Sequence, residues 1–390
     1  MTPSKLTCLL SSPLLLVLAA GGGGGGGVPQ PAPTGYVTLD LGADSTPDWS
    51  QVVMGIKEVD VSADGTHWAV LSQPAKTFDL LQVQNGGIIN LANNAPLAAG
   101  TYQVRITWAT INYANQVLQP AYVYPVGSAS GLVLSMPVTT QLGGTLTVQE
   151  GATTSELLML DTASAVQSFT GTGVLFQPSP QVFGVTSASV SGHIVDGSAH
   201  AIAGTEVFAE VVDGTGTPQV MRRAITNASG AYRMDGLPAS FGGTQASYFL
   251  VAMPAASAST AYPAGGVGPV QPQAGQSLDA GSLAFSASPI STGQIGLTLT
   301  PKTPSGQGTF ADLRQTLTIG AGSYFLIVRG DAAVTGSGSD TYTFAALPSL
   351  SYGVNATRFI PGGQVTGSAS SSSLIGVSGG ATTSVSLAVQ

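Results

Sequence analysis

Short runs in which apolar and polar residues alternate recur along most of the chain, and turn-forming residues separate them. In residues 102–108, the large apolar side chains occupy the even positions, whereas Arg105 and Thr107 occupy odd ones. A period of two places successive side chains on opposite faces of a β-strand. A helical period does not persist; residues 155–166 are the segment in which a short helix is expected. The pattern therefore predicts an all-β protein.

The alternation restarts twice, and this divides the chain into parts. We expect a signal peptide over residues 1–20 and a Gly/Pro-rich linker over 21–35, because seven glycines followed by spaced prolines are typical of a linker. Three antiparallel β-sandwich domains in series should follow. These expected domains comprise residues 36–183, 188–286 and 290–390.

The second and third expected domains share a sequence pattern. Tyr232 precedes Leu237–Pro238 by five residues, and Tyr342 precedes Leu347–Pro348 by the same spacing. An aromatic strand follows in both cases. A strand that ends at a proline turn and a next strand that returns antiparallel would explain the pattern. We therefore expect an internal repeat.

Charge is scarce in this chain. Of 390 residues, 8% are charged, compared with about 25% in a typical globular domain. The formal net charge is −8, from 11 basic and 19 acidic residues. A nucleic-acid-binding protein needs a cationic surface to displace counterions from phosphates, and an anionic membrane surface attracts clustered Lys and Arg. The composition therefore argues against both partners.

The N-terminus has the features of a secretory signal. Lys5 precedes a mostly apolar run over residues 6–20 that ends in small residues. A membrane-spanning helix needs about 20 apolar residues, and residues 11–13 (Ser-Ser-Pro) interrupt this run. A buried helix is the alternative interpretation. We expect an exported protein without a transmembrane segment, in the periplasm, at the cell surface or secreted.

Cysteine usage bears on both stability and anchoring. The single cysteine, Cys8, lies within the expected signal, so the mature chain would offer no thiol for disulfides, zinc or nucleophilic chemistry. Residues 18–20 (Leu-Ala-Ala) resemble the first three positions of a bacterial lipobox. Gly21 stands where the lipid-accepting cysteine belongs, so a lipid anchor is not expected. Lipoprotein ancestry with a substituted cysteine is the alternative.

One segment resembles the start of a calcium-binding loop. Asp60, Ser62 and Asp64 supply oxygen atoms at positions 1, 3 and 5, and Gly65 follows at position 6. Position 12 is Leu71 rather than the bidentate glutamate of an EF-hand. Because Asp-Gly between two strands is also a strong hairpin signal, we expect a hairpin. A weak calcium site is the alternative.

Two further patterns resemble hydrolase sites. Glu58 and Asp60 would share one strand face about 7 Å apart, within the separation used by inverting glycosidases. Acidic pairs on solvated faces are common, however, and the sequence shows no cleft around them. Residues 376–380 read Gly-Val-Ser-Gly-Gly, but a hydrolase elbow needs a histidine base, and none follows position 200. A turn is expected there.

The histidines give little support for a metal site. His193, Asp196 and His200 could ligate a metal, but their spacing crosses a turn, and two histidines with one aspartate are a weak set. We therefore predict no catalytic residue, no metal site and no cofactor.

Aromatic residues gather in the first expected domain. Tyr113, Tyr122 and Tyr124 flank a polar segment that contains Asn and Gln. β-Sandwich modules often bind sugar rings on such aromatic platforms, so these three tyrosines are the candidate ligand-binding residues. Core packing is the competing interpretation, and it is favoured for Trp108, which shares a strand face with Val104.

Residues 36–183 resemble family 4382 of the domains of unknown function, a β-rich domain near the N-terminus of many bacterial lipoproteins. A late strand that contains Asp161 fits the family, whereas Asp44-Ser-Thr-Pro47 departs by one residue from its Asp-Ala-Pro. The resemblance implies no catalytic residues, because the family has no established activity. The segments that carry it are 56–61, 67–71, 78–86 and 97–106.

Residues 188–285 are similar to a carboxypeptidase-regulatory-like domain, a transthyretin-type β-sandwich, and residues 290–390 resemble the same class more distantly. This similarity implies non-catalytic accessory domains. The segments that carry it are 190–197, 202–207 and 226–232.

Together these features predict an exported, non-enzymatic envelope protein that acts as a structural or adhesive module, with envelope proteins as partners. The alternative is a carbohydrate-binding protein that holds glycans on the tyrosine platform.

Overall fold

The computed structural model describes residues 33–390 with short gaps. Its regular structure in these residues is almost entirely β-strand; a 3₁₀ turn, η1 (Leu80–Val83), and a single helical turn, α1 (Thr162–Ala165), are the exceptions. The prediction of an all-β protein built in series is confirmed. The residues left out of the description are 47, 110, 113–117, 120, 161, 169–172, 177–180, 185–186, 242–243, 256, 258, 305–306, 333, 336–338 and 360–364.

The first unit, residues 34–184, has two large sheets around one core. A four-stranded sheet has the order β16-β13-β1-β5, and the larger sheet has the order β11-β6-β2-β9-β10-β15-β14, with β3 and β4 on β2 and β12 on β6. The strands are β1 (Thr34–Ala43), β2 (Trp49–Ser62), β3 (Ala69–Ser72), β4 (Lys76–Asp79), β5 (Ile89–Ala98), β6 (Gly100–Ala109), β7 (Ile111–Asn112), β8 (Leu118–Gln119), β9 (Tyr122–Pro125), β10 (Leu132–Ser135), β11 (Thr139–Gln141), β12 (Leu146–Val148), β13 (Thr153–Leu160), β14 (Val166–Ser168), β15 (Gly173–Phe176) and β16 (Gln181–Gly184).

The second unit, residues 188–285, pairs a sheet of order β20-β17-β26 with a sheet of order β19-β18-β23-β25. Its strands are β17 (Ala188–Asp196), β18 (Glu206–Val212), β19 (Pro218–Ile225), β20 (Ala231–Leu237), β21 (Ser240–Phe241), β22 (Thr244–Gln245), β23 (Tyr248–Ala252), β24 (Thr260–Ala261), β25 (Gly265–Val270) and β26 (Ser277–Phe285).

The third unit, residues 290–390, pairs a sheet of order β24-β27-β31-β30, with β35 also on β27, and a sheet of order β29-β28-β32-β33, with β34 on β32. Strand β24 thus joins a sheet of the third unit. The strands are β27 (Ile290–Thr300), β28 (Gly308–Ile319), β29 (Gly322–Ala332), β30 (Val334–Thr335), β31 (Asp340–Pro348), β32 (Ser351–Phe359), β33 (Val365–Ser370), β34 (Ile375–Gly376) and β35 (Thr382–Ala388).

The second and third units have the same topology, which confirms the internal repeat. Strand β17 lies between antiparallel β20 and parallel β26, and β27 lies in the same way between β31 and β35. The repeated sequence pattern has a structural role at the end of β20 and β31. The Tyr248 hydroxyl donates a hydrogen bond to the carbonyl of Pro238, and the Tyr352 hydroxyl donates to that of Pro348. Each buried tyrosine therefore ties its strand to the preceding proline turn.

The sequence had led us to expect purely antiparallel sheets. The sheets contain parallel pairs as well. Each unit contains a parallel pair that joins an early strand to a late one: β1 with β13, β17 with β26, and β27 with β35. The chain between the two strands of each pair passes through the other sheet, so it returns in the same direction. The alternation of apolar and polar residues within one strand does not indicate this long connection, nor does it indicate the direction of the partner strand.

The helix expected over residues 155–166 is wrong for most of its length. Residues 155–160 belong to β13, which is hydrogen-bonded to β1 on one edge and β16 on the other. Leu158 and Leu160 alternate into the core, and a single helical turn follows at residues 162–165. Pairing on both edges satisfies the backbone of this segment as a strand, and this outweighs its weak helical pattern.

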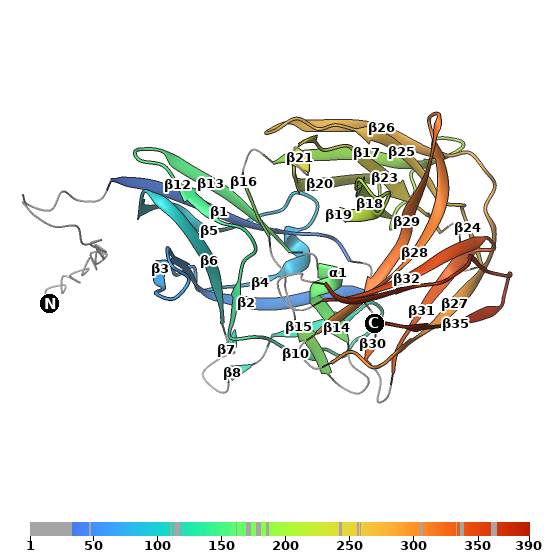
Figure 1. Ribbon diagram of the computed structural model, residues 1–390, viewed down its shortest axis with the longest axis horizontal. Coiled ribbons are helices and arrows are strands. Elements are labelled where there is room, and N and C mark those ends of the chain that lie inside the picture. Colours follow the sequence, from blue (N-terminus) through green and yellow to red (C-terminus); the bar gives the residue numbers. More distant parts are fainter. Residues whose placement is uncertain are drawn as a thin grey trace, which may run out of the picture.

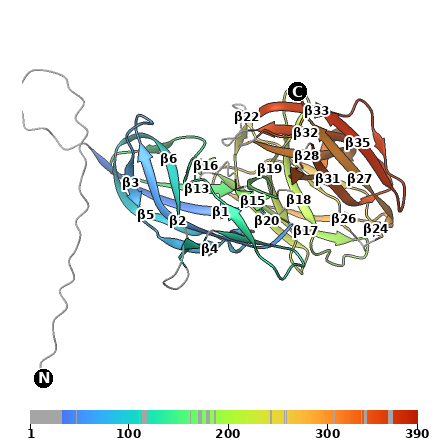
Figure 2. The same ribbon diagram turned by 90° about the horizontal axis from the view of Figure 1, so that it is seen from below.

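The second and third units share an apolar interface. Phe249 and Val251 of β23, and Met253 just after it, pack into the core of the third unit. The Phe249 and Tyr324 rings have centroids 4.3 Å apart. The first unit lies at one end of the molecule and packs against the second, whereas the third unit forms the other end (Figures 1 and 2). The first unit also contacts the third directly, because α1 lies against β29 and β14 against β30, so each of the three units packs against the other two.

Candidate functional site

The tyrosine platform lies on strand β9. Tyr122 and Tyr124 point to the same face, with ring centroids 5.6 Å apart and ring planes at 87°, and both side chains are half-buried. Val123, between them, is buried in the core on the opposite face. The structure therefore brings together two of the three candidate tyrosines; Tyr113 lies outside the described residues.

Neighbouring strands extend this platform. Tyr122 is paired with Val53 of β2 and with Val133 of β10, which is 55% exposed, and Tyr124 is paired with Gln51. Directly paired residues of antiparallel strands share a face. The face combines two aromatic rings, an exposed apolar side chain and an amide. Such a surface offers ring faces for apolar contacts and polar groups at their border, which is the chemistry that a sugar ring requires.

Trp108, in contrast, belongs to the core. It is 6% exposed, its ring packs edge-on against Phe176 at 5.1 Å, and its Nε1 donates a hydrogen bond of 2.8 Å to Thr140 Oγ1. The competing interpretation of packing is therefore confirmed for this residue.

Asp60 is part of a buried ion pair. Its carboxylate, 2% exposed, accepts hydrogen bonds from Arg105 Nε and Nη2 at 3.1 and 3.0 Å and from Thr107 Oγ1 at 3.0 Å. The Arg105 guanidinium in turn lies 4.3 Å from the centre of the Trp68 ring. These contacts join β2 to β6 and hold the following turn, so the carboxylate has a structural role.

Asp64 closes the turn between β2 and β3, which confirms the hairpin. Its carboxylate accepts hydrogen bonds from the backbone N–H groups of Thr66 and His67, both at 2.8 Å, and from the Ser62 hydroxyl at 3.0 Å. The bonds from His67 and Thr66 hold the pKa of Asp64 well below its usual range. Of the residues in the calcium-loop pattern, Asp60 therefore joins two strands, whereas Ser62 and Asp64 take part in the turn.

Glu58 and Asp60 do not form an open acidic pair. Glu58 is near the surface, where its carboxylate lies 3.5 Å from Lys57 Nζ and 3.4 Å from Gln73 Nε2, whereas Asp60 is buried under Arg105. A register shift in β2 between Ile56 and Glu58 interrupts the regular alternation that the sequence had suggested.

Asp196 also closes a turn. It accepts hydrogen bonds from the backbone N–H groups of Ser198 and His200, at 2.8 and 2.9 Å, and its second oxygen lies 3.1 Å from His200 Nδ1. These bonds lower the pKa of Asp196, the largest cause being the bond from the His200 backbone. His193 is exposed on β17. In the described ranges, no group of three or more His, Cys, Asp or Glu side chains is arranged to hold a metal ion.

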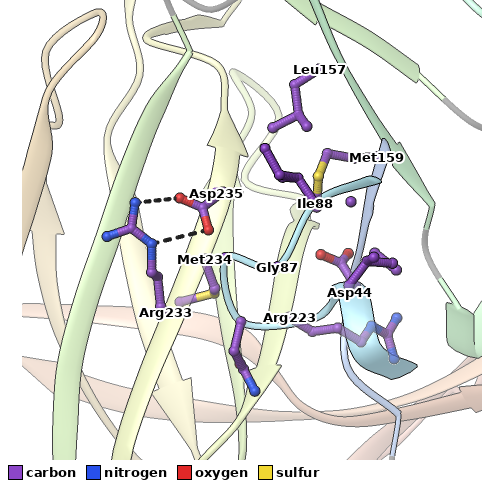
Figure 3. A pocket seen from close by; sticks show the side chains of 14 residues that line it. Asp44, Gly87, Ile88, Leu157, Met159, Arg223, Arg233, Met234 and Asp235 are labelled. Carbon is purple, nitrogen blue, oxygen red and sulfur yellow. Dashed lines mark hydrogen bonds and ion pairs between the residues drawn. The ribbon is translucent and has the colours of Figure 1, made fainter. Parts of the chain in front are cut away.

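The junction between the first and second units encloses a small cavity, which the sequence did not reveal (Figure 3). Arg233 Nη2 lies 2.7 Å from Asp235 Oδ1, and this ion pair contacts the turn at Gly86. Met159 and Asp44 line the opposite side. A cavity of about 10 Å³ holds at most one water molecule, so this is a packed junction.

A buried acid joins the second and third units. Glu210 of β18 is 0% exposed, and its Oε2 accepts a hydrogen bond of 3.0 Å from the backbone N–H of Ile327 in β29. Burial, together with the nearby carboxylate of Asp312, raises the pKa of Glu210 to about 8, against the effects of the Ile327 bond and of Arg314. Strand β18 has a second glutamate, Glu206, and its other five residues are apolar. The cover that the third unit provides over Glu210 could not be predicted from this local pattern.

The N-terminal part matches a family that is described as a domain of unknown function (DUF4382), over residues 34–178. This match confirms the resemblance predicted for the first unit and brings no activity with it. No curated protein matches the chain. Across the described residues, no helix has the length and apolar character needed to cross a membrane.

Solved structures show distant similarity. The Bacillus anthracis TIE protein has 10% identity over 92% of this chain and 51% of its own, with a TM-score of 0.19. A streptococcal ancillary pilin has 12% identity over 91% and 99%, with a TM-score of 0.19. Two B repeat units of the Staphylococcus aureus collagen-binding protein have 9% identity over 92% and 99%, with a TM-score of 0.20. The chain spans about half the length of the first, and scores this low carry no function over.

Proposed function

We propose that this chain is an exported, non-enzymatic envelope protein that acts as a structural or adhesive module. One observation carries the proposal: the acidic groups that the sequence offered for chemistry are used to hold the fold. Asp60 joins two strands, and Asp64 and Asp196 each close a turn.

The packing of the units supports a structural role. The Arg233–Asp235 ion pair of β20 lies against the turn at Gly86 of the first unit, and Phe249 and Glu210 of the second unit contact the third. Contacts of both apolar and polar kinds at successive junctions resist bending between units. Units that are packed together in this way suit a structural module.

Export and the accessory nature of the later units are part of the proposal. Residues 1–20 would direct secretion, and Gly21 would leave the mature chain without a lipid anchor. The second unit would be a carboxypeptidase-regulatory-like accessory domain. The compartment would be the periplasm, the cell surface or the medium, with envelope proteins as partners.

Labelling of intact cells and an attachment assay test this proposal. Antibodies to the third unit should stain unpermeabilised source cells or detect the chain in periplasmic or medium fractions. Deletion of the gene should reduce attachment to surfaces or other cells, or weaken the envelope against detergent, and a plasmid copy should restore it. A chain that remains in the cytoplasm, or a deletion without either phenotype, would contradict the proposal.

A second candidate function is glycan binding by the Tyr122–Tyr124 platform. The observation that favours it is the half-exposed, edge-to-face ring pair beside the exposed Val133. A glycan array should show binding that Tyr122→Ala and Tyr124→Ala each weaken at least tenfold. Tyr36→Ala is the matched control, because Tyr36 is 40% exposed on a different strand. Binding that survives both platform changes would refute this function.

A further inference from the structure

The third unit has one side where two strand edges face each other. Strand β33 is the last strand of its sheet, and β35 has β27 as its one strand neighbour in the described chain. Two backbone hydrogen bonds join these edges at one point, from Ser368 N to Gln390 O at 3.1 Å and from Gln390 N to Ser368 O at 3.4 Å. Away from this bridge the edges enclose a groove of about 620 Å³.

The groove is lined by small and uncharged side chains. Thirteen residues line it; seven are serines, and none is charged. Val385 and Leu387 belong to the core of the unit and reach its floor, where they retain 8% and 7% exposure. The lining residues are Ser368, Ala369, Ser370, Ser371, Ser372, Ser373, Ile375, Ser384, Val385, Ser386, Leu387, Ala388 and Gln390.

These two edges lack two of the features that normally prevent edge pairing. Exposed edges usually carry a charge, a proline or a bulge, because their unpaired backbone groups recruit other strands. Strands β33 and β35 contain no charged residue and no proline. The register irregularity of β33 lies between Val365 and Gly367, outside the residues that line the groove. Each of the other described edge strands of six or more residues has one or the other: Pro96 in β5, Pro218 in β19, Arg233 in β20, Pro269 in β25, Asp279 in β26 and Arg329 in β29.

The internal repeat supplies a direct comparison. Strand β25 has the same place in the second unit as β33 in the third, and it contains Pro269. The third unit also covers it: a Cβ atom added at Gly266 would lie 2.9 Å from Ile319 Cδ1. The edge in the second unit therefore both carries a proline and is covered, whereas β33 in the third unit has neither of these two protections within the described residues.

We propose that this groove binds one extended, uncharged peptide segment of a partner protein, which pairs through its backbone with β33 and β35. Strand addition to a sheet edge draws affinity from main-chain hydrogen bonds and specificity from alternate side chains. Small apolar side chains of the peptide would cover Val385 and Leu387. A charged side chain would lose its hydration without finding a countercharge, so the groove selects against it.

The geometry favours a single strand over a second copy of the chain. Every described strand already has a neighbour in a sheet, so a second copy could offer only the edge of a folded sheet. Such an edge could pair with β33 or with β35, but the bridge between Ser368 and Gln390 holds these two edges too close for a whole sheet to enter between them. The groove is separate from the tyrosine platform, so the two proposals stand or fall independently.

Selection from a phage library of random seven-residue peptides on the immobilised full chain tests the proposal. Enriched peptides should be uncharged and should alternate small polar with apolar residues. A fluorescent copy of one such peptide should bind Ser384→Lys and Ser386→Lys chains at least tenfold more weakly. Thr318→Lys is the matched control, because Thr318 is exposed on the interior strand β28 of the same unit; it should leave binding unchanged.

Amide hydrogen exchange shows where the peptide binds. Exchange in residues 365–370 and 382–388 should slow when the peptide is added. Circular dichroism and the melting temperature check that each lysine variant is folded, and two independent positions keep the test valid if one variant misfolds. Absence of enriched peptides, equal binding to both lysine variants, or slowed exchange elsewhere would overturn the proposal. If the free chain dimerises and Ser386→Lys abolishes this dimer, a second copy of the chain is the occupant of the groove. That result would also overturn the proposal.

Discussion

Replacing Glu210 with glutamine should remove most of the pH dependence of the thermal stability of the second and third units, which meet at an interface that includes this residue. The acid is fully buried and accepts a hydrogen bond from Ile327 N across the interface. Its pKa is raised to about 8 from an ordinary value of 4.5, chiefly by burial. The folded protein therefore keeps this proton at pH values where the unfolded chain loses it.

The direction of the effect follows from linkage. Because the native state binds the proton more tightly, the stabilising contribution is complete below pH 4.5, declines as the pH rises to about 8, and is lost above it. One pKa unit corresponds to 1.36 kcal/mol, so a shift of about 3.5 units amounts to about 5 kcal/mol. For a structure of about 200 residues, 1 kcal/mol moves Tm by about 2–4 °C, which predicts a change on the order of 10 °C.

Calorimetry of the full chain at pH 5, 7 and 9 measures this effect. The wild-type transition of the second and third units should fall between pH 5 and pH 9. The Glu210→Gln transition should move much less, because the amide stays neutral and its carbonyl can still accept from Ile327 N. Glu58→Gln is the control, since Glu58 lies near the surface beside Lys57. Equal differences between Glu210→Gln and wild type at pH 5 and pH 9 would refute the reasoning.

Five further substitutions have expected outcomes. Asp60→Leu should destabilise the first unit by about 2–4 kcal/mol in urea unfolding, because the Arg105 guanidinium loses its carboxylate partner. Tyr248→Phe and Tyr352→Phe should each cost about 1–2 kcal/mol, since each removes the same tyrosine-to-proline hydrogen bond. Gly86→Ala should speed proteolysis at the first junction, because Gly86 has φ of +89° and a Cβ there would lie 2.9 Å from Arg233 Nε. Gly21→Cys should gain palmitate label in a host with lipidation enzymes, whereas labelling of the unchanged chain would contradict the assignment of an unlipidated signal.

The features that the sequence predicted are those that depend on local pattern. Strand alternation predicted the fold class, Asp64-Gly65 predicted the hairpin, and the cluster of tyrosines in the first expected domain included Tyr122 and Tyr124, which the structure brings together. Each depends on neighbours within a few positions of the chain. The continuous apolar run of β23 also carried a signal that we did not use, because a strand that is apolar at every position is buried on both faces.

The features that the sequence missed depend on partners far along the chain. Glu210 is 117 residues away from Ile327, and Asp60 is 45 residues away from Arg105. From the sequence alone, an acidic residue in an alternating strand is expected to face solvent. Its burial can be predicted only when the unit that covers it is known. The β-strand period likewise cannot distinguish a parallel neighbour from an antiparallel one, because the side-chain alternation is the same in both.

Comparison of the repeated units separates what holds the fold from what is available for binding. Both later units keep the buried tyrosine that bonds to a proline carbonyl, and both keep the same strand order. They differ at one edge, where β25 contains Pro269 and packs against the third unit, whereas β33 has no proline or charge and borders a groove. An unprotected edge is a liability in the free protein, because it invites uncontrolled pairing. Within the described chain the third unit covers β25, whereas β33 borders an open groove, so β33 is the edge that is available for the strand addition proposed above.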